Sequence, residues 1–117
     1  MHLPEPSPET IGFAPAPGDR ILIAGDELDL PMVRAALASL PPKSRGQVFI
    51  EVGGEAEVET LEAPSRFSVC WLYRDRGQSL RRSVDAWLSE MLPVSGVTDH
   101  RVYAWVSQDG AARVLTN

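Results

Sequence analysis

A chain of 117 residues is sized for one domain with a modest core, and its 44% hydrophobic and 23% charged residues are ordinary for a folded protein. The formal net charge of -5 disfavours binding to nucleic acid or to anionic membranes, and no apolar run approaches the ~20 residues that cross a bilayer. The single cysteine, Cys70, excludes an intrachain disulfide and fits a reducing compartment. We therefore expect a cytoplasmic protein with no nucleic-acid or membrane partner.

Residues 1–19 are rich in proline, which removes amide donors and favours extended backbone. We predict a stiff linker here, because the segment has neither the charged start nor the apolar stretch of a signal peptide. Ordered structure is expected to begin at Arg20, so that residues 20–117 form one α/β domain.

The first predicted strand is the apolar run Ile21-Leu22-Ile23-Ala24, which is typical of a strand covered on both faces. Gly25 and an acidic turn follow it. Apolar residues then recur at spacings of three and four from Leu30 to Leu40, which predicts a helix that Pro41 ends. The acidic residues before this helix complement the positive end of its dipole.

The later elements alternate in the same way. We predict strands over 47–52, 65–73 and 101–106, a loop or one short helix over 55–64, a helix capped by Ser79 and ended by Pro93, and a short helical segment over 110–115. Strands separated by helices predict an α/β fold with three layers: a Rossmann-like sheet of four parallel strands in the order 3-2-1-4, with helices on both faces.

In such a sheet, ligands bind beyond the carboxyl ends of the strands, where the strand order reverses. That rule selects two loops, Gly25-Asp26-Glu27-Leu28 after the first strand and Ser107-Gln108-Asp109-Gly110 after the fourth. Residues 74–76, which follow the third strand, are expected on the same edge but further out.

One interpretation of the first loop can be set aside from the sequence. The segment RILIAGDELDLP resembles the start of a response-regulator receiver domain, in which an acidic pair holds magnesium. A receiver also needs an aspartate at the end of its third strand and a lysine after its fifth. Here the third strand ends at Tyr73 with no carboxylate before Asp75, and the sole lysine is Lys43. The chain is therefore not predicted to be a receiver.

A second resemblance covers most of residues 12–114. The segment FAPAPGDR followed by ILIAGDELDLP and MVRAALASLPP is similar to the start of the C-terminal domain of the siderophore-interacting protein family. Residues 46–52, the segment Cys70-Trp71-Leu72-Tyr73-Arg74 and the segment Tyr103-Ala104-Trp105-Val106 continue the similarity in the same order.

This resemblance implies the fold of the NAD(P)H-binding half of ferredoxin-reductase-type flavoproteins, and a role in ferric-siderophore reduction and iron acquisition. It implies that Gly25, Asp26 and Glu27 face the nicotinamide, that Ser107, Gln108 and Asp109 form the second loop of the site, and that Arg74 reaches an adenosine phosphate. The implied partners are a flavin-binding domain and a ferric-siderophore substrate. FAD would bind only if a separate barrel domain supplied its site.

The sequence also departs from the family pattern. The segment that would form the flavin-binding barrel is absent, and Ser107-Gln108-Asp109 replaces the usual glycine-glutamate pair. The chain ends at Asn117, before the last helix and strand of the family domain, so we expect an incomplete domain whose fourth strand is an exposed edge.

The charge of the first loop argues against one mode of nucleotide binding. Asp26, Glu27 and Asp29 stand where a phosphate would meet the helix N-terminus, and like charges ~4 Å apart repel by roughly 4 kcal/mol at an effective dielectric of about 20. No G-x-G-x-x-G sequence is present. We expect the phosphates of a bound nucleotide to lie toward Arg74 or Arg76.

Other reactive residue types have simpler interpretations. Cys70 is expected to be a buried small hydrophobe, and His100 a surface turn residue. Trp71 and Trp105 are expected to be packing residues, with the alternative that they line a ring-binding cleft. No set of His and Cys has metal-ligand spacing, so no metal site or catalytic residue is predicted.

Two functional hypotheses follow. The first is a nicotinamide-nucleotide-binding domain of the siderophore-interacting type, inactive as an oxidoreductase alone because nothing in it can bind a flavin. The second is a non-enzymatic protein-interaction module that keeps the fold and has lost the nucleotide. The acidic first turn favours the second, and the extent of the resemblance favours the first.

Overall fold

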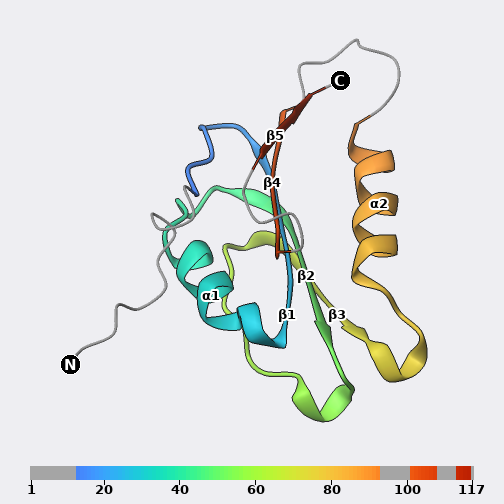
Figure 1. Ribbon diagram of the computed structural model, residues 1–117. Helices are drawn as coiled ribbons and strands as arrows, with labels where there is room; N and C mark the ends of the chain where they lie inside the picture. Colours follow the sequence, from blue (N-terminus) through green and yellow to red (C-terminus); the bar gives the residue numbers. More distant parts are fainter. Residues whose placement is uncertain (1–12, 93–100, 108–112, 117) are drawn as a thin grey trace, which may run out of the picture.

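The computed structural model describes residues 13–92, 101–107 and 113–116 of the chain. A mixed five-stranded sheet, ordered β3-β2-β1-β4-β5, forms the middle layer. In Figure 1 helix α1 lies on one side of this sheet and helix α2 on the other. The elements are β1 (Arg20–Asp26), the 3-10 turn η2 (Glu27–Asp29), α1 (Leu30–Ala38), β2 (Arg45–Val52), the 3-10 turn η3 (Glu55–Glu57), β3 (Arg66–Tyr73), the 3-10 turn η4 (Arg74–Arg76), α2 (Leu80–Met91), β4 (Arg101–Val106) and β5 (Arg113–Thr116).

The predicted α/β class with three layers is confirmed, together with the order of the first four strands. These strands pair in parallel, and their registers place Arg20 beside both Arg45 and Val102. Strand β1 is buried on both faces, as its uninterrupted apolar sequence predicts. Its alternate residues therefore divide the core into two clusters.

Each cluster is closed by one helix. Ile21 and Ile23 point toward α1, where they join Val33 and Leu37 in a core cluster that also contains Trp105. Leu22 and Ala24 point the other way and pack with Leu80 and Val84 of α2. These positions show how the period-two pattern of the strand and the helical spacing of the apolar residues meet in the core.

Both helices begin as their sequences predict. Pro31 lies in the first turn of α1, where its missing amide costs no hydrogen bond. Ser79 caps α2 by accepting a hydrogen bond from the amide of Arg82 at 3.4 Å. Helix α1 ends at Ala38, two residues before the last apolar position of the predicted stripe, because Ser39 already caps the final turn.

The prediction of a helical segment over 110–115 was wrong in the part of it that the structure describes. Residues 113–116 form β5, which pairs antiparallel with β4 and places Leu115 opposite Val102. Leu115 packs on the α2 cluster while its neighbour Val114 is exposed, which is the alternation of a strand. The expected exposed edge on β4 is likewise covered, by β5.

Cys70 was predicted to be buried and is exposed. It lies on β3, the strand at one end of the sheet, and its register partner Phe49 on β2 is buried with the α2 cluster. On the same face of β3, Ser68 is exposed and Leu72 is buried. The residues packed on this face therefore cover only part of β3. An apolar-looking strand at a sheet edge therefore need not bury both faces.

Candidate functional site at the carboxyl edge

The candidate site lies where the four parallel strands end. At this edge β1 runs into η2, β2 is followed by η3, and β3 runs into η4. In Figure 1 these three turns lie at the lower end of the sheet, η2 in cyan-blue, η3 in light green and η4 in yellow. Parallel pairing thus places the predicted loop after β1 and residues 74–76 at the same edge of the sheet.

Asp26 caps the turn that follows β1. Its carboxylate accepts a hydrogen bond from the amide of Leu28 at 2.9 Å, and the carboxylate of Asp29 accepts one from the amide of Asp26 at 2.9 Å. This reciprocal capping box explains why acidic residues stand at both positions. A side chain at Gly25 would place its Cβ 2.8 Å from the Cβ of Asp29, so the tight turn requires glycine there.

The surroundings shift the pKa values of Asp26 and Glu27 in opposite directions. Burial, opposed in part by the amide of Leu28 and aided by the nearby charge of Asp29, raises the pKa of Asp26 above its ordinary value. The pKa of Glu27 is lowered, chiefly because its carboxylate accepts a hydrogen bond from Arg74. The surroundings therefore favour the protonated form of Asp26 and the ionised form of Glu27.

Arg74 is brought to the first loop, but as an ion-pair partner. Its guanidinium Nη2 lies 2.5 Å from Oε1 of Glu27, and its Nη1 lies 3.9 Å from Oε2 of Glu51. The hydrogen bond to Glu27 raises the pKa of Arg74, so that the cation is held in its charged form. The arginine expected to receive a phosphate already neutralises two carboxylates.

Glu51 was missed in the sequence analysis. It is the next-to-last residue of β2, opposite Asp26 in the register with β1, and its side chain is only 18% exposed. The available signal was a single carboxylate within the otherwise apolar run Val48 to Val52, because such a charge at a strand end needs a partner. Arg74 is that partner.

Ser107 directly follows β4 and is partly buried, at the same edge as Gly25 because Val106 pairs with Ala24. Gln108 and Asp109, the other two predicted residues of that loop, lie outside the described residues, as does His100. The structure therefore brings Gly25, Asp26, Glu27 and Arg74 together and places Ser107 one strand away.

Two polar atoms near this edge are buried without a hydrogen-bond partner among the described residues: Nε1 of Trp105, near the end of β4, and Oε2 of Glu27. Trp105 is 6% exposed and Trp71 is partly buried, and both belong to or pack against the α1 cluster. The prediction of packing roles is confirmed for both rings. An unpaired indole N–H is nonetheless unusual, because it costs about 1–3 kcal/mol.

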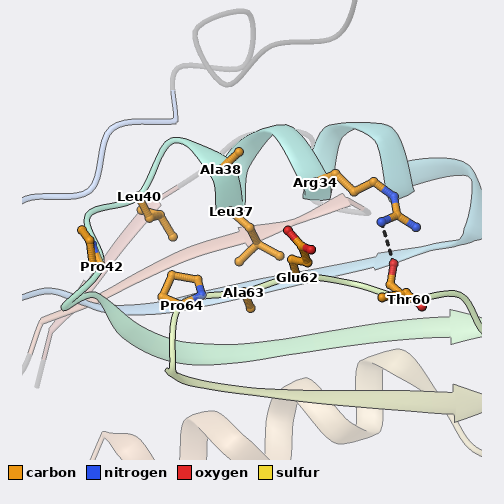
Figure 2. Close-up of a pocket in the computed structure, with 9 residues that line it drawn as sticks. All are labelled: Arg34, Leu37, Ala38, Leu40, Pro42, Thr60, Glu62, Ala63 and Pro64. Atoms are coloured by element: carbon orange, nitrogen blue, oxygen red, sulfur yellow. Dashed lines mark hydrogen bonds between the residues drawn. The ribbon is translucent and has the colours of Figure 1, made fainter.

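A second hollow lies away from this edge. A cavity of about 640 Å³ lies between α1 and the segment that precedes β3, and Figure 2 shows the side chains that line it. Arg34 closes one end by donating to the carbonyl of Thr60 at 2.6 Å and pairing with Glu59 at 3.0 Å. Its walls are mainly alanine, leucine and proline, with Glu62 as the one lining carboxylate, and no hydrogen bond described in the structure joins Glu62 to another lining residue, so we assign no chemistry to the cavity.

The described residues contain no group of three or more metal-ligating side chains and no helix long and apolar enough to span a membrane. The candidate site consists of the acidic turn at Asp26 and Glu27, Arg74 paired with two glutamates, and the two buried polar atoms without a partner.

Comparison with known proteins identifies the family. The model of the siderophore-interacting protein family matches residues 18–114. The chain is 46% identical over 63 residues to an uncharacterized protein of Mycobacterium bovis, covering 53% of this chain and 22% of that protein. It is 33% identical over 78 residues to the ferric vibriobactin reductase ViuB of Vibrio cholerae, covering 67% of this chain and 28% of the reductase.

Solved structures share the fold. A siderophore utilization protein from T. fusca aligns with a TM-score of 0.59 and 24% identity, over 80% of this chain and 34% of that one. The siderophore-interacting protein SipS from Aeromonas hydrophila aligns with a TM-score of 0.55 and 22% identity, over 78% and 34%. The chain spans about a third or less of the length of these relatives. It belongs to the siderophore-interacting protein family.

Proposed function

We propose that this chain takes part in ferric-siderophore handling, as the α/β half of a reductase that draws electrons from a reduced nicotinamide. The observation that carries the proposal is the 33% identity to a ferric vibriobactin reductase over 67% of this chain. The sheet edge that the fold rule selects is the one where Gly25, Asp26 and Glu27 lie, with Ser107 on the neighbouring strand.

The two unsatisfied buried atoms support binding of the nicotinamide part. The indole N–H of Trp105 is a donor and the Oε2 atom of Glu27 is an acceptor. A nicotinamide carboxamide offers the complementary pair, a carbonyl acceptor and an NH₂ donor. In this proposal the two atoms supply the kinds of hydrogen-bonding group that a nicotinamide carboxamide uses.

Fewer residues at this edge can bind the phosphates of the nucleotide. The acids of η2 repel a pyrophosphate placed over that turn, so we assign the phosphates to the outer arginines. Arg74 is the first candidate and must exchange its pair with Glu27. Arg76 pairs with Glu55 at 3.3 Å across side chains that are 59% and 77% exposed, and such a surface pair is easily exchanged.

Electron transfer to iron needs a second group. A nicotinamide gives up two electrons as a hydride, whereas each ferric ion takes one, and a flavin supplied by a barrel domain accepts the hydride and releases electrons singly. In this proposal the chain's own residues bind and orient the nicotinamide and exclude water from it. The reductase is complete only with the flavin-binding partner, and its substrate is a ferric siderophore.

One observation favours a second candidate, a protein-interaction module without nucleotide. Arg74 is already held by both Glu27 and Glu51, so binding a phosphate would leave two carboxylates without a counter-charge. In this alternative the same ion pairs are purely structural.

Titration of the purified chain with NADPH and NADH, followed by tryptophan fluorescence and calorimetry, distinguishes the two. The reductase proposal expects a Kd tighter than about 1 mM, about -4 kcal/mol, with Arg74→Ala weakening NADPH binding and Trp105→Phe weakening both nucleotides. The control is Arg82→Ala, which removes an exposed arginine from α2. Absence of binding to wild type would leave the interaction module as the function of the isolated chain.

A further inference from the structure

Every parallel strand of this sheet begins with arginine. The first residues of β1, β2, β3 and β4 are Arg20, Arg45, Arg66 and Arg101. The registers pair Arg20 with Arg45 and Arg45 with Arg66, so three of these arginines stand side by side across three neighbouring strands. Neighbouring strands lie about 4.8 Å apart, which brings three like charges into a row.

The row lies on the face of the sheet that α2 covers. Arg20 precedes Leu22 by two residues, and Leu22 packs with Leu80 and Val84 of that helix. A cavity of about 250 Å³ opens at this place, between the amino end of the sheet and the last turns of α2. It is lined by the three arginines together with Gln47, Ser68 and Trp87.

Within the described residues, no carboxylate lies within ion-pair distance of Arg20, Arg45 or Arg66. The guanidinium of Arg20 donates to the sulfur of Met91 at 2.7 Å, which is a weak acceptor. The buried carboxylate at this edge, Asp19, is already engaged, because Arg101 lies 3.1 Å from it and the amide of Ala16 donates to it at 2.8 Å.

A fourth cation adds to the row. A cavity of about 420 Å³ on the neighbouring surface is lined by Lys43 and by the same Arg45 and Arg66, so these two arginines border both hollows. In a chain of net charge -5, this edge keeps a cluster of cations whose charge nothing described in the protein neutralises.

We propose that the arginine row binds a compact polyanion, a small molecule that carries two or more carboxylate or phosphate groups. Guanidinium forks bind such groups bidentately, and the spacing of the strands presents one fork every 4.8 Å or so. The ring of Trp87 walls the cavity and the hydroxyl of Ser68 supplies a further donor. A volume of about 250 Å³ admits a small polyanion but is below the range of about 300–1,000 Å³ typical of drug-sized ligands. The cavity lies at the amino ends of the strands, so it is separate from the nucleotide site proposed at the opposite edge.

The test is a titration of the full chain with inorganic pyrophosphate and, separately, with citrate, at low salt, by calorimetry and by amide NMR. We expect saturable binding that weakens as salt is added, with the largest NMR shifts at Arg20, Arg45 and Arg66. The double variant Arg45→Gln/Arg66→Gln should lose at least about tenfold in affinity, which is about 1.4 kcal/mol. Pyrophosphate binding without citrate binding would support the proposal and identify a phosphate ligand, and the reverse would identify a carboxylate ligand.

Two variants make the result specific. Arg82→Gln removes the same charge from the exposed surface of α2 and should leave the affinity unchanged. Arg45→Lys/Arg66→Lys keeps the charge but not the planar fork, and it should fall between wild type and the glutamine variant. The proposal is overturned if neither anion binds, if Arg82→Gln weakens binding as much as the double variant, or if the NMR shifts map to the carboxyl edge.

Discussion

The two edges of the sheet carry opposite charge, and they use arginine in opposite ways. At the carboxyl edge the described acids, namely Asp26, Glu27, Asp29, Glu51, Glu55, Glu57 and Asp75, outnumber two arginines, and both of those arginines are paired with glutamates. At the amino edge Arg20, Arg45 and Arg66 stand in register without a described carboxylate partner. A cation that is already paired must give up its carboxylate before it binds a ligand, whereas these three arginines of the amino edge have no such pair to exchange among the described residues.

In this sheet the position of the loops and the distribution of charge point to different edges. The fold rule for parallel sheets directs attention to the carboxyl edge, where the loops gather. The charge distribution directs anions to the amino edge. A nicotinamide ring and a polyanion have different chemistry, so the two edges can serve different ligands. Substitutions can disturb each edge separately.

The largest effect is expected from a glycine at the amino edge. Gly46 lies between Arg45 and Gln47, and a Cβ there would collide with the backbone carbonyl of Ile21 and lie 2.9 Å from the ring of Phe67. Because backbone cannot move aside cheaply within a paired sheet, Gly46→Ala should lower the free energy of unfolding by about 1–3 kcal/mol or more. Urea denaturation measures this loss.

The matched variant at the carboxyl edge is Gly25→Ala. Its Cβ would lie 2.8 Å from both Oδ2 and Cβ of Asp29. The carboxylate can rotate away, but the Cβ moves only with the backbone of the short turn η2. The variant should therefore lose the capping hydrogen bond, about 1 kcal/mol, together with some strain in the turn, and still lose less than Gly46→Ala, whose Cβ meets the backbone of a paired strand. Equal losses for the two glycines would show that the amino edge is not the more tightly packed of the two.

Much of this architecture is predictable from local pattern. The strand Ile21 to Ala24 and the apolar stripes of both helices follow from the periodic spacing of hydrophobic residues, because burial is what these patterns produce. The final strand was not predictable in that way. Only four residues form β5, and Leu115 is packed on the core only because pairing with β4 places it opposite Val102.

The candidate site was predictable in position and less so in chemistry. Gly25, Asp26 and Glu27 were selected because parallel strands end together. The pairing of Arg74 with Glu27 joins residues that are 47 positions apart, and the row of arginines requires the strand registers, neither of which local spacing contains. Contacts between distant segments are what sequence patterns leave out.

An intermediate effect is expected from removing like charges at the amino edge. Because Arg45 and Arg66 stand directly opposite each other, Arg45→Gln/Arg66→Gln should raise the free energy of unfolding at low salt by about 0.2–1 kcal/mol. The gain should shrink as salt screens the repulsion in the wild type. Thermal denaturation across a salt series measures it, with Arg82→Gln as the control. A loss of stability at low salt would mean that these arginines have counter-charges after all.

The smallest effect is expected from Arg74→Gln at the carboxyl edge, since the pair with Glu27 joins side chains that are 42% and 31% exposed. The lowered pKa of Glu27 means that its ion pair stabilises the fold above the ordinary pKa of a glutamate, and that this contribution is lost as the pH falls through the lowered value. Without Arg74 the pKa of Glu27 should rise toward its ordinary range. The variant should therefore be less stable than wild type at neutral pH, and the two should converge in acid. Carboxyl NMR titration follows the pKa, and denaturation at several pH values follows the stability. If the pKa of Glu27 stays low without Arg74, the backbone of the turn, rather than the ion pair, holds it there, and pairing with Arg74 adds little to the stability of the carboxyl edge.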